Sequence, residues 1–471
     1  MLYLKAIRSK IGTPNSIHIS SMAHPDNLLE LQRLLKDGPR EAAGLLADLR
    51  ISQPTFSRLW AGMQNGVALG ATRRRRYALR RQIPGVPSPL PLFRVAADGQ
   101  AAPLGQLELL EGGCYALTFA TGHDYLLFQG MPYFLRDLRP QGFLGRLEPA
   151  KNKDLDLPDD ILRWSDEHVL KYLSRRSEHA PGDIVVGNES YARLLAPAPD
   201  GENALLAAAR RRARYPRLAE HAMQGDPPGS SAGGEQPKFT QIVARDDGRI
   251  EHVIVKFSPR TDSAGGRRWG DLLVCEHLAL DTLRRHGIGA ATTSLVEAEQ
   301  RVFLEVVRFD RSGRNGRLPM LTFSAMDGEL GMLDQSWSAA ARELGRQNLL
   351  SPADRRTVEI LDLFGALIGN TDRHHGNIAA AWARKGPLRL LPCYDMLPML
   401  YRPNQHGEVV PREWAAASVR KLELSHLEFC FAMAQDFWQA VFDERRISDE
   451  FKQVTARHVA LMNQLNPRPL R

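Results

Sequence analysis

The pattern of apolar and polar positions near the N-terminus predicts three short helices followed by a β-hairpin. Apolar residues recur at helical spacing in three successive segments, and Gly38 is a stop signal after the first of them. Ser52 is placed to cap the third helix, and a proline in the first turn of that helix costs no hydrogen bond. The predicted helices cover residues 27–38, 40–50 and 53–63, and the hairpin covers residues 67–81. This order predicts a winged helix-turn-helix domain within residues 22–82.

A proline-rich segment, residues 83–92, follows this domain and is typical of a linker. Short apolar runs punctuated by glycine and aspartate come next, and they predict a small β-rich subdomain. Helices are expected around residues 161–176. The region shows no catalytic constellation, so we expect its role to be architectural.

Longer apolar runs in the second half of the chain predict buried strands and helices. An apolar strand ends at Lys256, a helix that carries Glu276 follows, and another strand breaks at Arg308. Further on, an apolar helix ends near Gly369, and a polar loop leads into a strand that begins at Ile378. Helices are expected again near the C-terminus. This mixture of sheets and helices predicts an α+β fold.

The composition is that of an ordinary soluble globular protein. The chain of 471 residues is long enough for about three domains, and its 43% of hydrophobic and 25% of charged residues are typical values. No apolar run approaches the roughly 20 residues that span a bilayer. Residues 1–21 lack the apolar core of a secretory signal, so we expect a disordered leader, with Met22 as an alternative start.

The cysteines exclude a disulfide framework and a zinc site. They are far apart, without a CxxC pair and without a histidine at ligand spacing. Isolated thiols suit a reducing cytoplasm, where we expect the protein, with association with the nucleoid left open. The cysteines are Cys114, Cys275, Cys393 and Cys430.

The positive charge is concentrated at the N-terminal end. The net charge is +8, and residues 1–82 alone hold 14 Lys/Arg and five Asp/Glu, a surplus of nine that leaves −1 for the remaining chain. Such a distribution predicts a DNA-binding domain attached to a neutral body. The alternative is a helical docking domain whose arginines are only solvated. The predicted DNA contacts are Thr55, Ser57 and Arg58 in the major groove and Arg73, Arg74, Arg75 and Arg76 at phosphates or in the minor groove.

A second group of arginines, within residues 210–217, falls on a predicted helix. We interpret it as a solvated or partner-facing helix surface rather than as a further DNA-binding site.

The polar loop of residues 370–377 carries the sharpest candidate chemistry. Asp372 and Asn377 are five residues apart in this loop, and Asp395 follows a hairpin. Phosphoryl transfer needs a carboxylate to accept the hydroxyl proton, plus an amide and a second carboxylate to hold Mg²⁺. The alternative is an Asx-rich turn in which Asn370 and Asp372 cap backbone groups.

The parts upstream of this loop complete the order of a bilobal kinase. A loop rich in glycine and serine can cradle phosphates with its backbone N–H groups. Lys256 ends a buried strand, which is costly without an anionic partner, and Glu276 on the next helix is a natural partner. Lys256 could instead extend to solvent from an edge strand. The strand that breaks at Arg308 could form the hinge between the lobes.

Five motifs together resemble the HipA family of bacterial serine/threonine kinases, which are type II toxin components. The motifs are SAGGEQPKF, IVKFSP, VRFDR, GNTDRHHGN and YDMLP, within roughly residues 90–450. The catalytic core is also similar to that of phosphatidylinositol kinases. The built-in DNA-binding head resembles the YjjJ/HipH-like branch of the family, so a separate antitoxin is in question.

The resemblance implies roles for individual residues. Asp372 matches the catalytic base, Asn377 and Asp395 match the Mg²⁺ ligands, and Lys256, paired with Glu276, matches the lysine that binds ATP. Ser231 matches the serine that such kinases autophosphorylate, with Ser230 as an equally reactive neighbour, and a phosphate there is expected to inactivate the kinase. The remaining nucleotide contacts are Ala232, Gly233, Gly234, Glu235, Gln236 and Lys238 in and after the ATP loop, and Val307 and Phe309 at the hinge.

The sequence therefore predicts an ATP- and Mg²⁺-dependent protein kinase with a tethered winged helix-turn-helix. The smaller lobe, with the β-rich subdomain, is expected at residues 93–310, and the larger lobe at residues 311–471. Expected partners are a protein substrate and duplex DNA but no membrane, and a homodimer is left open. The alternatives are a transcriptional regulator whose kinase-like body only senses nucleotide, and a kinase that acts on a small molecule or lipid. The substrate and the DNA sequence are not specified.

Overall fold

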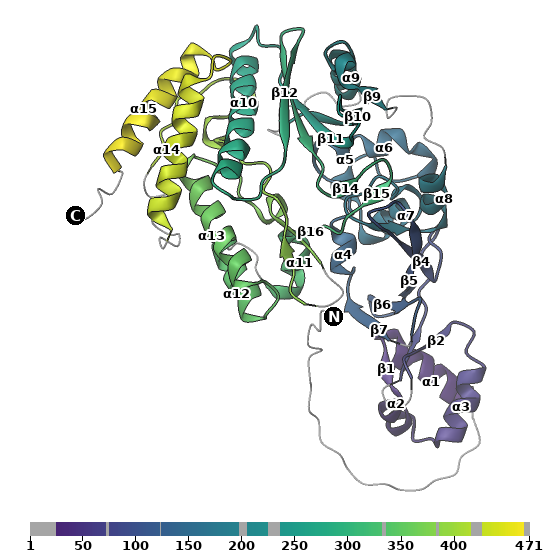
Figure 1. Ribbon diagram of the computed structural model, residues 1–471. Coiled ribbons are helices and arrows are strands. Elements are labelled where there is room, and N and C mark those ends of the chain that lie inside the picture. Colours follow the sequence, from purple (N-terminus) through teal and green to yellow (C-terminus); the bar gives the residue numbers. More distant parts are fainter. Residues whose placement is uncertain are drawn as a thin grey trace.

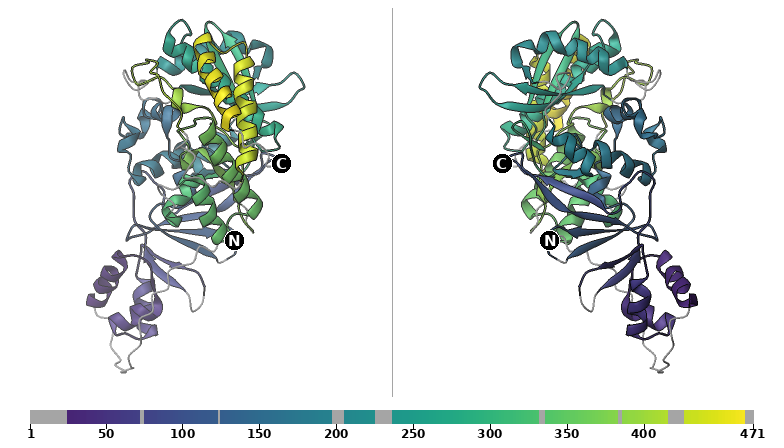
Figure 2. Two further views of the ribbon diagram at one scale, coloured as in Figure 1. Left: turned by 90° about the vertical axis from the view of Figure 1, so that its left-hand side faces the viewer. Right: turned by 90° about the vertical axis from the view of Figure 1, so that its right-hand side faces the viewer.

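The computed structural model is an α+β protein in which a small head projects from a larger, two-lobed body (Figure 1). Figure 2 shows the head at one end of the molecule, next to the sheet that follows it in the chain. The predicted leader and Met22 lie outside the described residues. The described residues are 25–71, 75–122, 124–196, 205–224, 236–331, 336–382, 386–415 and 426–465.

The head contains three helices and a small antiparallel sheet with the order β1-β3-β2. Ser52 caps the third helix, because its Oγ accepts a hydrogen bond from the Thr55 N–H at 3.4 Å. The elements are α1 (Pro25–Lys36), β1 (Arg40–Glu41), α2 (Ala42–Leu49), α3 (Gln53–Ala61), β2 (Gly66–Leu69) and β3 (Arg76–Leu79). This is the order of elements of a winged helix-turn-helix, and we keep that interpretation of the head. The hairpin of β2 and β3 is called the wing below.

The wing packs against the body. Two ion pairs cross the boundary, Arg80 with Glu108 and Arg81 with Glu167, each at 2.7 Å. A buried apolar cluster also joins the two parts, formed by Val67, Leu69, Ala78, Leu110, Cys114 and Ala116. The orientation of the head on the body is therefore fixed by side-chain packing.

The segment after the head forms a middle domain built on an antiparallel sheet of order β7-β6-β5-β4-β8. Its first strand begins at Leu90, within the proline-rich segment that was predicted to end at about residue 92. Leu90 and Leu92 are both fully buried, and burial of alternate side chains outweighs the high proline content here. The strands are β4 (Leu90–Val95), β5 (Ala101–Leu109), β6 (Cys114–Phe119), β7 (Tyr125–Gln129) and β8 (Ile184–Val186). The helices are α4 (Tyr133–Arg136), α5 (Gly142–Arg146), α6 (Glu148–Lys151), α7 (Asp166–Arg176) and α8 (Asn188–Leu195).

The smaller lobe of the body is a sheet of order β12-β13-β11-β10-β9 with a helix on each face. Side chains of α9 pack with Val255 and those of α10 with Leu304, which lie on opposite faces of the sheet. Strand β12 was not predicted from the sequence. The elements are β9 (Leu206–Ala207), α9 (Arg211–Gln224), β10 (Lys238–Ala244), β11 (Ile250–Phe257), α10 (Ala264–Arg285), β12 (Thr293–Ala298) and β13 (Arg301–Val307).

The larger lobe is mostly helical and carries a small sheet of order β16-β17-β18. Its helices share one buried core with α10, so this core also joins the two lobes. The elements are β14 (Arg311–Ser312), β15 (Gly316–Arg317), β16 (Leu321–Thr322), α11 (Phe323–Leu330), α12 (Trp337–Arg346), α13 (Pro352–Leu367), β17 (Ala379–Ala381), β18 (Arg389–Leu390), α14 (Leu427–Asp443) and α15 (Asp449–Leu465). Within the described ranges, every helix is too short or too polar to cross a lipid bilayer.

Candidate functional site

Lys256, near the end of β11, is buried between two carboxylates. Its Nζ donates hydrogen bonds to Glu276 Oε1 and Oε2 at 2.6 and 2.7 Å, and it also donates to Asp395 Oδ1. Glu276 belongs to α10, and Asp395 follows β18, so three distant parts of the chain meet at one ammonium group. Strand β11 lies inside the sheet, and the Lys256 side chain is only 8% exposed. The alternative of a lysine that extends to solvent from an edge strand is therefore excluded.

The charges of this group stabilise one another. Burial lowers the pKa of Lys256, but the charges of Asp395 and Glu276 outweigh burial and raise that pKa above its usual value. Burial raises the pKa of Asp395, but the neighbouring Lys256 outweighs burial, so the pKa of Asp395 is lowered. The pKa of the fully buried Glu276 is raised by burial, although Lys256 opposes this shift. Lys256 is thus held as a cation and Asp395 as an anion.

Lys238, the first residue of β10, and Gln236, two residues before it, add polar side chains near Lys256. Lys238 is paired directly with Lys256 across β10 and β11, so both side chains leave the same face. The Nε2 of Gln236 donates to the Phe257 carbonyl at 2.5 Å, and the buried Oε1 of Gln236 has no partner among the described residues. The rest of the predicted ATP loop lies outside the described residues: Ser230, Ser231, Ala232, Gly233, Gly234 and Glu235.

The polar loop that follows α13 is folded by its own amide side chains. The Asp372 N–H donates to Asn370 Oδ1 at 2.9 Å, and the Asp372 carbonyl accepts from Asn377 Nδ2 at 2.9 Å. The first bond forms an Asx turn, as the alternative reading of this loop expected. However, neither bond uses the carboxylate of Asp372, and the Asn377 bond uses the amide nitrogen rather than the amide oxygen. The turn and the predicted chemistry are therefore compatible.

The segment that contains Tyr394 and Asp395 is joined to this loop by two hydrogen bonds. The Tyr394 hydroxyl donates to the Gly376 carbonyl at 2.7 Å, and Asn370 Nδ2 donates to the Asp395 carbonyl at 3.4 Å. Asp395 has φ of 54°, a left-handed conformation that is uncommon for residues other than glycine. Its side chain is 29% exposed, unlike the buried Lys256 and Glu276. The segments that carry Asp372, Asn377 and Asp395 therefore lie side by side.

The predicted hinge lies beside the same segment. Val307 is the last residue of β13, and its N–H donates to the Thr292 carbonyl at 2.8 Å. Phe309 lies beyond the strand, with its ring centroid 5.5 Å from that of Tyr394. Asp310 then binds the Gly182 N–H of the middle domain at 3.0 Å, which fixes the chain where it passes between the lobes.

The residues at this junction fit a nucleotide with a divalent cation. Two carboxylates surround one ammonium, which leaves negative charge to attract a metal ion, and the two lysines of neighbouring strands suit phosphate oxygens. Carboxylate and amide oxygens are the ligands that Mg²⁺ takes in phosphoryl-transfer sites. No cluster of three or more His, Cys, Asp or Glu side chains suited to a metal occurs in the described part of the chain. The predicted pair, Asn377 and Asp395, contains only one such side chain.

The head presents part of its predicted DNA-binding surface. The prediction that Thr55 is exposed is wrong, since it is only 3% exposed and its hydroxyl lies 3.0 Å from Ser52 Oγ. Thr55 is the third residue of α3, where the capping bond turns its side chain inward. Ser57 and Arg58 are exposed on the same helix. In the wing, Arg75 is exposed, Arg76 pairs with Glu41 at 3.4 Å, and the other two predicted contacts, Arg73 and Arg74, lie outside the described residues.

The partners that fix the loop, Asp327, Asp362 and Trp337, were not found from the sequence, although a histidine beside Asp372 was expected to hold the loop by a hydrogen bond. His375 Nδ1 lies 2.8 Å from both carboxylate oxygens of Asp327 on α11. Asp362 of α13 accepts a hydrogen bond from Arg373 at 3.0 Å. The Trp337 indole donates to the His374 carbonyl at 3.0 Å. These partners are 11 to 48 residues away in the sequence, and no local motif marks them.

Comparison with known protein families gives two matches. The sequence pattern described as "YjjJ-like toxin, middle domain" matches residues 86–195, which include the sheet of the middle domain. The pattern described as "HipA-like C-terminal domain" matches residues 230–462, which include Lys256, Asp372, Asn377 and Asp395.

The chain also resembles individual proteins. It is 39% identical to the toxin YjjJ of Escherichia coli (strain K12) over 431 residues, which cover 90% of this chain and 95% of that protein. A solved structure of Shewanella oneidensis MR-1 HipA, in complex with HipB and operator DNA, matches with a TM-score of 0.47 and 15% identity over 79% of this chain and 95% of that chain. The Helicobacter pylori proinflammatory kinase CtkA matches with a TM-score of 0.32 and 10% identity over 49% of this chain and 88% of that chain.

Proposed function

Because the chain belongs to the YjjJ-like branch of the HipA-like toxin family, we propose that it is an ATP- and Mg²⁺-dependent serine/threonine protein kinase with a built-in DNA-binding head. The observation that carries this proposal is the buried contact of Lys256 with both Glu276 and Asp395 beside the loop of Asp372. A lysine held by two acids at the junction of two lobes is costly to build. In phosphoryl transfer such a lysine binds the phosphate oxygens of the nucleotide, which accounts for its presence.

Each residue has a distinct task in this proposal. Asp372 orients the acceptor hydroxyl and takes its proton, and its carboxylate is not used by the hydrogen bonds that fold the loop. Asn377 and Asp395 hold Mg²⁺, which when bound neutralises charge on the phosphate oxygens. Glu276 keeps Lys256 charged and fixed in place, so that Lys256 can bind phosphate oxygens when the nucleotide enters.

Two alternatives use the same site, and only the first makes a different prediction about its residues. A regulator that only senses nucleotide would keep Lys256 but need no free carboxylate at Asp372. A kinase for a small molecule or lipid would share the whole site. We favour a protein substrate because the five motifs in order resemble the HipA family of serine/threonine kinases, whereas only the catalytic core resembles phosphatidylinositol kinases. The substrate itself, and the need for a separate antitoxin or a homodimer, are not specified by this site.

We expect the protein in the cytoplasm, where ATP and DNA are both present.

The direct test of the kinase proposal is self-labelling of the full-length protein. Incubation with γ-labelled ATP and Mg²⁺ should label a peptide that contains Ser231, the serine that matches the autophosphorylated serine of the HipA family and precedes β10 in the sequence. With Ser231 as the acceptor, as the family resemblance implies, the Ser231→Ala variant should lose this label and the Ser230→Ala variant should retain it. The reverse pattern would assign the label to Ser230. If neither the protein nor any added protein extract becomes labelled, the nucleotide-sensing alternative is the better one.

The head is proposed to bind duplex DNA with α3 in the major groove. Its support is the concentrated positive charge of residues 1–82 and the exposure of Ser57 and Arg58 on α3. The wing supplies Arg75 near its tip, while Arg76, the first residue of β3, is engaged with Glu41 of β1. We therefore expect Arg76 and the buried Thr55 to contribute less to DNA binding than Arg58.

Replacing Arg58 by alanine should weaken DNA binding by the full-length protein about 5- to 150-fold, the effect of losing a good base contact. The measurement is fluorescence anisotropy with labelled duplexes at several salt concentrations. Wild-type affinity should fall steeply with salt, because phosphate contacts release counterions. The matched control is Arg33→Ala on α1, whose side chain is paired with Glu30. Equal losses in both variants, or binding that does not respond to salt, would favour a protein-docking head.

A further inference from the structure

The short helix α11 lies between the middle domain and the loop that carries Asp372. It contacts α4 of the middle domain on one side and the turn formed by residues 375–377 on the other. The strand before it, β16, pairs with β17. In this pair Leu321 of β16 lies opposite Ala380 of β17. Because β17 directly follows the loop, α11 and β16 support the loop from two directions.

The loop is attached to α11 by a buried acid–imidazole pair. Asp327 of α11 and His375 of the loop are both less than 10% exposed, and His375 Nδ1 lies 2.8 Å from both oxygens of Asp327. The Phe323 N–H also donates to the Ile378 carbonyl at 3.0 Å, where the loop ends. A displacement of α11 would therefore displace the loop.

The N-terminus of α11 is held by Asp137, which directly follows α4 in the middle domain. Asp137 accepts hydrogen bonds from both the N–H and the hydroxyl of Thr322, each at 2.5 Å. Thr322 in turn caps α11, since its hydroxyl accepts from the Ala325 N–H at 3.2 Å. Burial raises the pKa of Asp137 to about 6, although the bonds from Thr322 oppose the shift. Asp137 is therefore a poorly hydrated acid whose described hydrogen bonds go to the start of α11.

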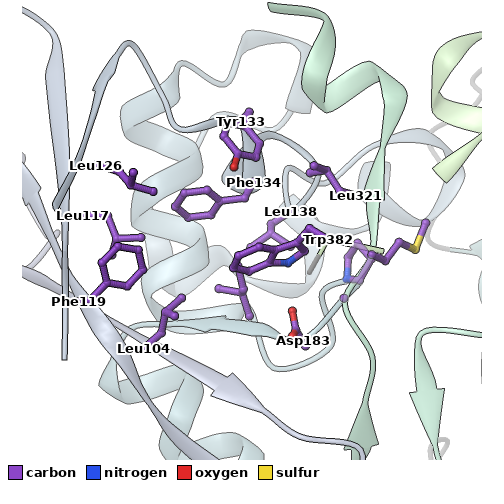
Figure 3. Close-up of a pocket in the computed structure, with 14 residues that line it drawn as sticks. Leu104, Leu117, Phe119, Leu126, Tyr133, Phe134, Leu138, Asp183, Leu321 and Trp382 are labelled. Carbon is purple, nitrogen blue, oxygen red and sulfur yellow. The ribbon is translucent and has the colours of Figure 1, made fainter. Parts of the chain in front are cut away.

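Mostly apolar side chains line a pocket beside the Asp137–Thr322 junction. Figure 3 shows a pocket next to this junction in which Tyr133, Phe134 and Leu138 of the middle domain face Leu321 and Trp382 of the larger lobe. In such an environment an unpaired polar group is costly, so the two bonds to Asp137 are hard to replace by water. An eight-residue helix also has little stability of its own, which makes α11 dependent on how its end is held.

We propose that Asp137 is a positioning residue through which the middle domain sets the position of the catalytic loop. Asp137 holds Thr322 and thereby the start of α11, and α11 holds the loop through Asp327 and His375. The proposal rests on the kinase function proposed above and gives the middle domain a part in it. The sequence alone indicated only an architectural role for this domain.

The test compares Asp137→Ala with Glu108→Ala in the full-length protein. Glu108 is a buried acid of the middle domain that faces the head through Arg80, so its loss should disturb a different junction. Asp137→Ala should lower kcat about 10- to 100-fold, the size of effect that follows from misplacing a catalytic group. The KM for ATP should change less than kcat, because Lys256 and the hinge are untouched although Asn377 moves with the loop. Glu108→Ala should keep the wild-type kcat.

Hydrogen–deuterium exchange supplies a readout that does not depend on activity. In Asp137→Ala, the amides of residues 372–378 should exchange faster than in the wild type and in Glu108→Ala. Thr322→Ser, which keeps the hydroxyl, should behave as the wild type in both measurements. A wild-type protein without kinase activity would remove the proposed function but leave the exchange comparison valid. Unchanged exchange and unchanged kcat in Asp137→Ala, or equal changes in Glu108→Ala, would overturn the proposal.

Discussion

Replacing Asp372 by asparagine is expected to lower phosphoryl transfer by about 10²- to 10⁴-fold, the range that a general base contributes. Asparagine has the same shape but cannot accept the hydroxyl proton. The fold of the loop should survive, because Asp372 is held there through its backbone N–H and carbonyl. The change should therefore separate activity from stability. The measurements are the rate of label transfer from γ-labelled ATP and the melting temperature.

Asp443→Asn on the surface of α14 is a suitable control, since it is the same chemical change far from the site in the sequence. It should leave both the transfer rate and the melting temperature unchanged. Full activity in Asp372→Asn would contradict the role of Asp372. An Asp372→Asn protein that fails to melt cooperatively would instead show that its carboxylate is needed for folding.

Replacing Lys256 by methionine is expected to abolish nucleotide use and also to destabilise the protein by about 3–5 kcal/mol, the cost of breaking a buried ion pair. Methionine fills much the same space, so the loss comes mainly from Glu276, which remains fully buried without its cationic partner. Binding of a fluorescent ATP analogue measures the loss of nucleotide use, and the free energy of unfolding from urea titration measures the destabilisation.

The pH dependence of this loss has a definite sign. Burial already raises the pKa of Glu276 in the folded wild type, and removal of Lys256 should raise it further. A folded state that holds a proton more tightly than the unfolded state gains stability as the pH falls. The deficit of Lys256→Met should therefore shrink below neutral pH. The double variant Lys256→Met/Glu276→Leu should recover most of the stability at pH 7 and none of the nucleotide binding. A Lys256→Met protein as stable as the wild type would contradict the buried pair.

The contacts of the site could be predicted where one residue had few physically acceptable partners. A lysine at the end of an apolar strand needs an acid, and Glu276, on the following helix, is one within reach. The capping of α3 by Ser52 follows from local chemistry in the same way. Both contacts satisfy a polar group that would otherwise lack a partner, at a cost in free energy, and such contacts can be expected from the sequence.

Other features depend on tertiary packing that no local pattern records. Thr55 was expected on the exposed face of α3, but its position next to the cap turns it inward. The strand β4 begins inside a proline-rich segment because Leu90 and Leu92 face the core of the middle domain. The anchors of the loop, Asp327 and Tyr394, act through partners 48 and 18 residues away. In the sequence, nothing distinguishes Asp327 from the other acidic residues or Tyr394 from the other tyrosines.

The central claim is that Asn377 and Asp395 hold a divalent ion against a nucleotide bound by Lys256. The most direct measurement is a crystal structure of the full-length protein with Mn²⁺ and a non-hydrolysable ATP analogue, recorded with anomalous scattering. We predict a manganese peak within bonding distance of the Asn377 amide oxygen and an Asp395 carboxylate oxygen, with Lys256 on the phosphates. A manganese peak away from both residues, or a nucleotide bound outside the junction of the lobes, would contradict the account.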